Sequence, residues 1–199
     1  MSESARTVEA LERRAVVAEL LRDRGELLVI SGLGGTSWDV AAVGDDAGNF
    51  YLWGGMGCAV PLGLGLALAQ PARRVLVVTG DGEMLMGVGS LATVAAQQPR
   101  NLAIVVIDNE RYGETGGQLA HSAFGTDLAL MARGAGLAHA HTLHTLDALR
   151  GFRQQLHATE GPLFAVVKVA TANATMVLPP RDGVLLKQRF RAALLGDRP

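Results

Sequence analysis

Cysteine is almost absent from this chain of 199 residues, because Cys58 is the only one. A single thiol excludes an internal disulfide framework, and it also excludes zinc or iron–sulfur sites built from paired cysteines within this chain. We therefore expect a reducing, cytoplasmic setting. The first ten residues also lack the apolar core of a signal peptide.

Strong charge of one sign and long hydrophobic runs are absent as well. The 18 Lys and Arg residues face 19 Asp and Glu residues, and Lys168 and Lys187 are the only lysines. A net charge of −1 gives no basic surface field, so we expect neither a nucleic-acid partner nor an anionic-membrane partner. The longest apolar run, 58–69, is too short and too rich in glycine to cross a bilayer.

Glycine and apolar residues are plentiful: 25 residues are Gly, and 49% of the sequence is hydrophobic. This content suffices for a sizeable core and excludes a disordered chain. The length predicts a single domain over residues 1–199, with its core at about 27–195.

The hydrophobic pattern alternates short β-branched runs with segments of helical periodicity. Runs such as VLVVT and AIVVI are apolar without alternation, which fits strands covered on both faces of a parallel sheet. The expected strands are 27–31, 50–53, 75–79, 103–107, 138–142 and 164–169. The expected helices are 7–23, 57–69, 87–97, 127–133, 146–158 and 182–195, with 57–69 apolar all round and buried. Together they predict an α/β fold, a three-layer α/β/α sandwich with a six-stranded parallel sheet.

Polar residues follow two of the predicted strands where those strands end. Gly80-Asp81-Gly82 comes directly after strand 75–79, and Asp108-Asn109 follows strand 103–107. If one helical crossover joins these strands, both segments lie at the same edge of the sheet, where ligands bind. Carboxylate and amide oxygens suit Mg²⁺ or Ca²⁺, and Gly82 leaves room for a phosphate to approach backbone N–H groups. A Gly-Asp-Gly turn alone is common in ordinary loops, so the assignment depends on the whole segment.

The segment from Gly80-Asp81-Gly82 to Asn109 resembles the signature of the diphosphate-binding domain of thiamine-diphosphate (TPP) enzymes, which is GDG, a spacer and then Asn. Residues 53–57 (WGGMG) resemble the loop that meets the cofactor's aminopyrimidine. Residues 112–118 (YGETGGQ) resemble a loop in the small subunits of 2-oxoacid-processing members, and 187–190 (KQRF) resemble the ending of sulfopyruvate and phosphonopyruvate decarboxylases. The resemblance covers about 27–195 and implies the TPP-binding fold.

The resemblance assigns a role to each matching position. The implied metal ligands are the side chains of Asp81 and Asn109 and the backbone carbonyl of Arg111. Thr36 and Ser37 are implied to supply hydroxyl donors to phosphate. The full implied cofactor-binding set is Gly35, Thr36, Ser37, Gly54, Met56, Gly80, Asp81, Gly82, Glu83, Asn109, Arg111, Tyr112, Gly113 and Thr115.

Two residues of the WGGMG segment are implied catalytic residues, and one residue after GDG departs from the pattern. Gly54 is implied to accept a hydrogen bond from the pyrimidine amino group, and Met56 is implied to be the apolar wedge that bends the cofactor. Glu83 stands where family members usually carry a small residue. A carboxylate facing a diphosphate would be repelled, so we expect the Glu83 side chain to turn away while its N–H is used.

The Gly-rich loop 112–124 is a candidate lid over the site. Its candidate substrate-facing residues are Thr115, Gln118 and His121, and the last two join the implied catalytic set. His121 fits a surface loop histidine equally well. Three further histidines lack a nearby carboxylate or thiolate and are not expected to bind zinc: His139, His141 and His144.

In TPP enzymes a glutamate from a separate pyrimidine-binding domain activates the cofactor. The length of this chain leaves no room for a second α/β unit of about 150 residues. The resemblance therefore implies a partner subunit that supplies the glutamate, in an α2β2 or larger assembly with the cofactor at the interface.

The implied function is that of a decarboxylase subunit for a small anionic 2-oxoacid such as sulfopyruvate or phosphonopyruvate, with TPP and Mg²⁺ as cofactors. One alternative is a subunit of a carboligase or acyl-transferring enzyme similar to acetolactate synthase or transketolase. Another is a non-catalytic TPP-binding subunit or a flavodoxin-like flavin binder. A 2-oxoacid:ferredoxin oxidoreductase subunit is disfavoured, because its electron transfer normally needs cysteine-ligated clusters and Cys58 stands alone.

Overall fold

Six parallel strands form the central sheet of the computed structural model, which describes residues 10–158, 160–172 and 174–196. The strands lie in the order β2-β1-β3-β4-β8-β7, and each pairing is parallel. Their bounds are β1 Leu28–Ser31, β2 Asn49–Tyr51, β3 Val75–Gly80, β4 Leu102–Asp108, β7 His139–Leu143 and β8 Leu163–Lys168. The predicted six-stranded parallel α/β fold is confirmed.

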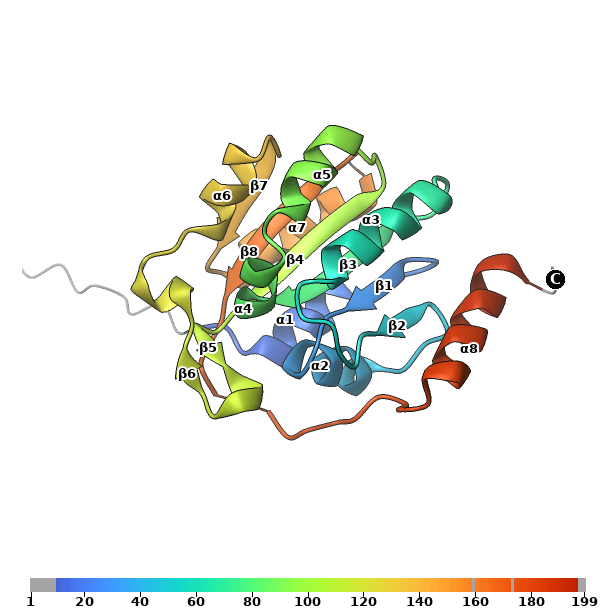
Figure 1. Ribbon diagram of the computed structural model, residues 1–199, viewed down its shortest axis with the longest axis horizontal. Coiled ribbons are helices and arrows are strands. Elements are labelled where there is room, and N and C mark those ends of the chain that lie inside the picture. The colour runs from blue at the N-terminus through green and yellow to red at the C-terminus, as the bar shows by residue number, and fades with distance from the viewer. Residues whose placement is uncertain (1–9, 159, 173, 197–199) are drawn as a thin grey trace, which may run out of the picture.

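Helices cover both faces of this sheet (Figure 1). One face packs against α1 (Arg13–Leu20), α2 (Gly35–Val43) and α7 (Leu146–Ala158). The other packs against α3 (Ala59–Ala69), α4 (Asp81–Met86), α5 (Ser90–Gln97) and α6 (Leu128–Gly134). Because successive strand residues point to opposite faces, Leu76 and Val78 join the first core while Val75 and Val77 join the second.

Several predicted helices differ from those observed. The helix predicted at 7–23 is the shorter α1, and 7–9 lie outside the described residues. The predicted helix 87–97 is only α5, preceded by the separate helix α4, and α2 was not predicted. The expectation that 57–69 is buried all round is wrong, because Leu62 and Leu68 of α3 are 38% and 49% exposed. No helix in the described ranges is both long enough and apolar enough to span a bilayer.

The segment before α1 lies at the carboxyl edge of the sheet. Leu11 forms a parallel bridge with Val169, just beyond β8, and its carbonyl accepts a hydrogen bond from Ala170 N at 2.8 Å. Glu12 then caps α1 by accepting hydrogen bonds from the backbone N–H groups of Arg14 and Ala15. This arrangement places the first turn of α1 beside the strand ends.

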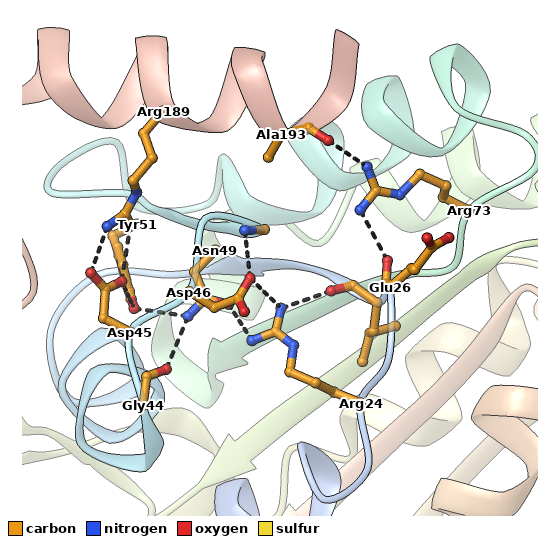
Figure 2. A network of polar contacts seen from close by, with 12 residues as sticks. Arg24, Glu26, Gly44, Asp45, Asp46, Asn49, Tyr51, Arg73, Arg189 and Ala193 are labelled. Carbon is orange, nitrogen blue, oxygen red and sulfur yellow. Dashed lines mark hydrogen bonds and ion pairs between the residues drawn. The ribbon is translucent and has the colours of Figure 1, made fainter. Parts of the chain in front are cut away.

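A long connection after β8 leads to the last helix, α8 (Gly183–Leu195), which lies beside the edge strand β2 (Figure 1). Hydrogen bonds and an ion pair hold α8 at this edge of the sheet (Figure 2). Arg189 binds Asp45 through two hydrogen bonds, and Arg73 donates to the carbonyl of Ala193 at 3.0 Å. Tyr51 of β2 donates a hydrogen bond to Asp45 at 2.9 Å. The last helix α8, the loop before β2 and β2 itself therefore form one network.

A small hairpin follows β4 that the sequence analysis did not predict. It consists of β5 (Arg111–Tyr112) and β6 (Gln118–Leu119), which pair antiparallel around the 3-10 turn η1 (Gly113–Thr115). A second 3-10 turn, η2 (His121–Phe124), follows it.

Candidate functional site

The strand order places one crevice at the carboxyl edge of the sheet. The chain leaves β1 toward β2 on one side, whereas β3 continues to β4 on the other, so the loops after β1 and β3 diverge. Gly80 pairs with Ile107, which brings residues 81 and 108–109 side by side at this edge. A cavity of about 100 Å³ opens here. Its lining residues are Arg13, Leu33, Gly35, Thr36, Trp38, Met56, Gly80, Asp81, Gly82, Glu83, Ile107, Asn109, Arg111, Tyr112, Gly113, Glu114 and Thr115.

Asp81, the first residue of α4, is a buried carboxylate on the cavity wall. Burial raises its pKa to about 6, and the nearby Asp108 adds to the increase. The Ser122 hydroxyl donates to Oδ2 at 2.8 Å and offsets part of this shift. The ionised carboxylate therefore lacks sufficient stabilisation, which a bound cation would supply.

Asn109 lies beside Asp81 and is also buried. Its Oδ1 accepts a hydrogen bond from the Arg111 backbone N at 3.2 Å, and the intervening Glu110 has a φ of 60°. The left-handed conformation of Glu110 turns the chain sharply after β4, which keeps both Asn109 and Arg111 on the cavity.

Lys168, at the end of β8, compensates the neighbouring carboxylates. Its Nζ lies 2.9 Å from Asp108 Oδ2 and 2.5 Å from Glu110 Oε1. The pKa of Lys168 is raised: burial lowers it, but the two carboxylates outweigh that effect. Because Lys168 binds Asp108, Asp81 is the one of these two neighbouring aspartates that is left to meet a cation.

The donor set fits a hard cation. Within 10–158, 160–172 and 174–196, no group of three or more His, Cys, Asp or Glu side chains is arranged to hold a metal ion. His139 and His141 of β7 are exposed. A cation beside Asp81 would therefore combine one carboxylate with the Asn109 amide and backbone oxygens, which is how Mg²⁺ is often held.

The structure gives a reason for a glycine at position 82 that differs from the one the sequence suggested. A Cβ at this position would overlap the ring of Tyr112, which packs directly on the glycine. The absence of a side chain here seats the Tyr112 ring against α4. Whether a phosphate also approaches this backbone stays a prediction.

Met56 reaches the cavity because the segment that carries it packs against the end of α4. Gly57 has a φ of 84°, and a Cβ there would overlap the backbone of Gly87. This backbone contact fixes the loop, and Met56 is half-buried on the cavity wall. Gly54 is exposed and does not line the cavity.

Thr36 and Ser37 lie in the first turn of α2 rather than in a loop. Their hydroxyls donate to the carbonyl of Gly32, at 3.0 Å and 2.6 Å respectively. Gly35 and Thr36 line the cavity and Ser37 does not. Contact of these hydroxyls with a phosphate would require them to exchange these partners, and it stays a prediction.

Glu83 folds back toward the strand ends. Its Oε2 accepts a hydrogen bond from the Thr79 hydroxyl at 2.8 Å, and its carboxylate occupies the space that a Cβ at Gly32 would need. Burial raises the pKa of Glu83, while the Thr79 hydroxyl and the nearby Leu33 N–H offset part of the increase. Its Oε1 has no hydrogen-bond partner of good geometry in the described part of the chain.

Only some of the site residues predicted in the segment 112–124 line the cavity. Tyr112, Gly113 and Thr115 line it, whereas Gln118 and His121 are exposed outside it. Gln118 and Thr115 bind each other, with Thr115 Oγ1 2.8 Å from Gln118 Oε1. The roles implied for Gln118 and His121 therefore stay predictions.

The sequence analysis missed several residues in or beside the cavity, among them Arg13, Trp38, Ser122 and Lys168. Arg13 and Trp38 line the cavity, Ser122 binds Asp81, and Lys168 binds Asp108. Each belongs to an element far along the chain from the GDG segment, so no local motif marks it.

Comparison with known proteins agrees with this geometry. Residues 42–167 match the family described as "Thiamine pyrophosphate enzyme, C-terminal TPP binding domain". The chain is 40% identical over 183 residues to the sulfopyruvate decarboxylase subunit beta of Methanothermobacter thermautotrophicus, with 92% of each protein covered. It is 42% identical over 186 residues to phosphonopyruvate decarboxylase of Streptomyces viridochromogenes, covering 93% of this chain and 45% of that protein.

A solved structure shows the same fold. Benzoylformate decarboxylase from Polynucleobacter necessarius superposes with a TM-score of 0.69 at 23% identity. The superposition covers 87% of this chain and 36% of that one. This chain thus corresponds to nearly the whole of one relative and to less than half of the other two proteins.

Proposed function

The chain belongs to the thiamine pyrophosphate enzymes, and on that premise we propose that it is the TPP- and Mg²⁺-binding subunit of a heteromeric decarboxylase for a small anionic 2-oxoacid. One observation carries the proposal. Asp81 and Asn109 meet at the carboxyl ends of neighbouring strands and share a cavity with Met56, in a chain 40% identical to a sulfopyruvate decarboxylase beta subunit.

The residues at the strand ends would hold the metal and the diphosphate. Asp81 and Asn109 would bind Mg²⁺ through their side chains, and Arg111 through its backbone carbonyl. The cost of burying the Asp81 carboxylate, seen in its raised pKa, supports this role because a divalent cation would offset it. Gly82 and Glu83, in the first turn of α4, would present backbone N–H groups to phosphate oxygens.

Bound TPP supplies an electron-accepting thiazolium ring that takes up the electron pair left when carbon dioxide departs. The protein's own contribution is to orient and to exclude water. Met56 would provide an apolar surface against the cofactor, and the Gly54 carbonyl would accept a hydrogen bond from its amino group. Thr115, Gln118 and His121, carried by the hairpin region, would face the substrate.

A separate pyrimidine-binding subunit completes the proposed enzyme. Two observations support it, and the first is that the relative matched over 92% of its length is named as a subunit, the beta subunit of sulfopyruvate decarboxylase. The second is that Trp53 and Gly54, and Leu62 and Leu68 of α3, are exposed and apolar or uncharged, as residues that meet another chain often are. The partner would supply the activating glutamate, in an α2β2 or larger assembly.

The test is Mg²⁺-dependent TPP binding by calorimetry, followed by assay of the assembled complex with sulfopyruvate and with phosphonopyruvate. Asp81→Ala should abolish binding, while Asp147→Ala, which removes an exposed carboxylate on α7, should leave it unchanged. Release of an aldehyde and carbon dioxide supports the decarboxylase. A larger ketol formed on adding an acceptor would favour the carboligase instead, and full activity of the chain alone would refute the need for a partner.

A further inference from the structure

Glu83, the third residue of α4, is 4% exposed and borders the cavity. The Thr79 hydroxyl, near the end of β3, donates a hydrogen bond to its Oε2 at 2.8 Å. The proposed function uses only the backbone N–H of Glu83, so its side chain has no assigned role. A small residue would fit the family pattern here, and burying a carboxylate costs free energy, so its presence calls for an explanation.

Gly32, the first residue after β1, is the surface against which the Glu83 side chain lies. A Cβ at Gly32 would overlap Oε2 and Cδ of Glu83. The backbone of Gly32 is not in the left-handed region, and its N–H donates to the carbonyl of Val78 at 2.8 Å, so the local conformation does not itself require glycine. The carboxylate that lies against position 32 therefore explains the lack of a side chain there.

Backbone N–H groups from three chain segments act on the Glu83 carboxylate. Burial raises the pKa of Glu83, and the hydroxyl hydrogen bond and the N–H groups of Leu33, Gly80 and Gly57 each offset part of that increase. Leu33 belongs to the loop between β1 and α2, and Gly57 directly follows Met56. One carboxylate thus lies where both of these segments meet the start of α4.

We propose that Glu83 is a positioning residue that holds the loop after β1 and the segment 53–57 against the start of α4, while Gly32 keeps its carboxylate out of the cavity. This inference rests on the proposed function, because both segments carry residues expected to contact TPP. A carboxylate has about four acceptor positions, so one side chain can hold several N–H groups. If it were displaced from Gly32, the carboxylate would move into the cavity that it borders and repel the diphosphate.

Hydrogen exchange on the full, ligand-free chain tests whether Glu83 holds the two segments. In Glu83→Ser the amides of Leu33 and Gly57 should exchange at least about threefold faster relative to those of β4, because they lose an acceptor. Glu83→Gln keeps the length and one acceptor oxygen and should recover most of the protection. Glu19→Ser is the matched control: Glu19 is also 4% exposed, but it pairs with Arg153 of α7, so the exchange of Leu33 and Gly57 relative to β4 should stay unchanged.

Calorimetry with Mg²⁺ and TPP tests the role of Gly32. Gly32→Ala should weaken TPP binding at least about tenfold, since the new Cβ displaces a charged carboxylate. The same substitution should cost less in a Glu83→Gln chain, and less than about threefold in a Glu83→Ser chain, where no carboxylate is left to displace. Gly151→Ala is the control, because nothing in the described structure lies within 4 Å of its added Cβ, and it should leave binding unchanged.

Thermal midpoints show which variants are folded, and if Gly32→Ala does not fold, the exchange of the two Glu83 variants decides. Unchanged relative exchange of Leu33 and Gly57 in Glu83→Ser would overturn this inference alone. An equal loss of TPP affinity from Gly32→Ala with and without the Glu83 carboxylate would do the same. Absence of Mg²⁺-dependent TPP binding in the wild type would instead overturn the proposed function, while the exchange rates would still decide whether Glu83 holds the two segments.

Discussion

Arg189 in the last helix faces Asp45 in the loop before β2, with Nη1 2.5 Å from Oδ2 and Nη2 3.0 Å from Oδ1. The two residues lie 144 positions apart in the sequence. A paired contact of this kind fixes orientation as well as distance, and Tyr51 adds a third hydrogen bond to the same carboxylate (Figure 2). The docking of α8 against the edge of the sheet therefore depends in part on the ionisation of Asp45.

We expect this contact to make stability depend on acid. Burial would raise the pKa of Asp45, but hydrogen bonds from Arg189 and Tyr51 outweigh burial, so its pKa lies below the ordinary value. A lowered pKa in the folded state adds stability above the unfolded pKa, near 4, and that stability is lost as the pH falls through the folded pKa. Asp45→Asn should cost about 0.5–1 kcal/mol at pH 7, measured by urea unfolding, because the pair is partly exposed.

The difference between Asp45→Asn and wild type should shrink as the pH falls through the folded pKa of Asp45, because protonation removes the charge of the carboxylate. Asp147→Asn is the control, since its partner Arg150 lies on an exposed helix surface and the pair should contribute less. Equal effects of Asp45→Asn at pH 7 and pH 2.5 would contradict the electrostatic explanation.

Asn101 should be among the least replaceable residues outside the cavity. Its Nδ2 lies 3.1, 2.9 and 2.7 Å from the carbonyls of Ala67, Gln70 and Arg73, so one amide closes the end of α3 onto the start of β3. Asn101→Asp turns an oxygen toward these acceptors and should destabilise the fold by roughly 2–4 kcal/mol at pH 7.

Acidification should recover part of the loss in Asn101→Asp, because a protonated carboxyl can donate a hydrogen bond. Gln98→Glu is the matched amide-to-acid control, on an exposed side chain, and should cost less than about 0.5 kcal/mol. Similar losses for both variants would show that the three carbonyls do not depend on Asn101.

The parallel sheet was predictable because its evidence is local. The runs 75–79, 103–107 and 164–169 are apolar on both faces, and only strands covered by two helical layers need that pattern. Helix α2 was missed for the opposite reason. Its buried polar residues Ser37 and Asp39 break the apolar period, and their partners Ser31 and Arg13 come from other elements.

The sequence predicted those site residues that directly follow a strand. Asp81 and Asn109 follow adjacent strands directly, so topology alone brings them together. Ser122, Lys168 and Arg13 reach the same region from a 3-10 turn, a strand and a helix distant in sequence. Such contacts depend on the completed fold, and no spacing in the sequence encodes them.

The packing of Tyr112 on Gly82 gives a prediction about the hairpin after β4. Gly82→Ala should displace the ring, because the new Cβ would overlap it, and should destabilise the protein by roughly 1–3 kcal/mol. Tyr112→Ala in the same chain should remove most of the penalty of Gly82→Ala, and thermal unfolding of the four variants of the cycle measures this coupling.

Gly151→Ala is the control for Gly82→Ala, since it lies in α7 with no atom near the added Cβ. It should be neutral or stabilise the helix by about 0.5–1 kcal/mol. If the effects of Gly82→Ala and Tyr112→Ala simply added, the ring and the glycine would not be coupled.

We expect the Asp81 carboxylate to lower the stability of the ligand-free protein, although the same carboxylate would help to bind Mg²⁺. Burial raises its pKa to about 6 in the fold, so the folded chain holds its proton more tightly than the unfolded chain does. The sign is therefore opposite to that of Asp45: stability without ligands should fall as the pH rises from about 4 through 6. Asp81→Asn removes this effect and should stabilise the ligand-free chain by roughly 1–3 kcal/mol at pH 8.

When Mg²⁺ and TPP are added, the wild type should become more stable than Asp81→Asn. The wild type gains stability as the logarithm of ligand concentration over Kd, whereas Asp81→Asn, with no carboxylate for the cation, should gain little. Thermal midpoints of both chains at pH 5 and pH 8, with and without ligands, provide the measurement, and Asp147→Asn should follow the wild type throughout. A ligand-free Asp81→Asn chain less stable than wild type at pH 8 would mean that the fold itself needs the Asp81 charge. The residue would then be structural before it is functional, and its burial beside Asn109 would not be a cost that a cation is needed to offset.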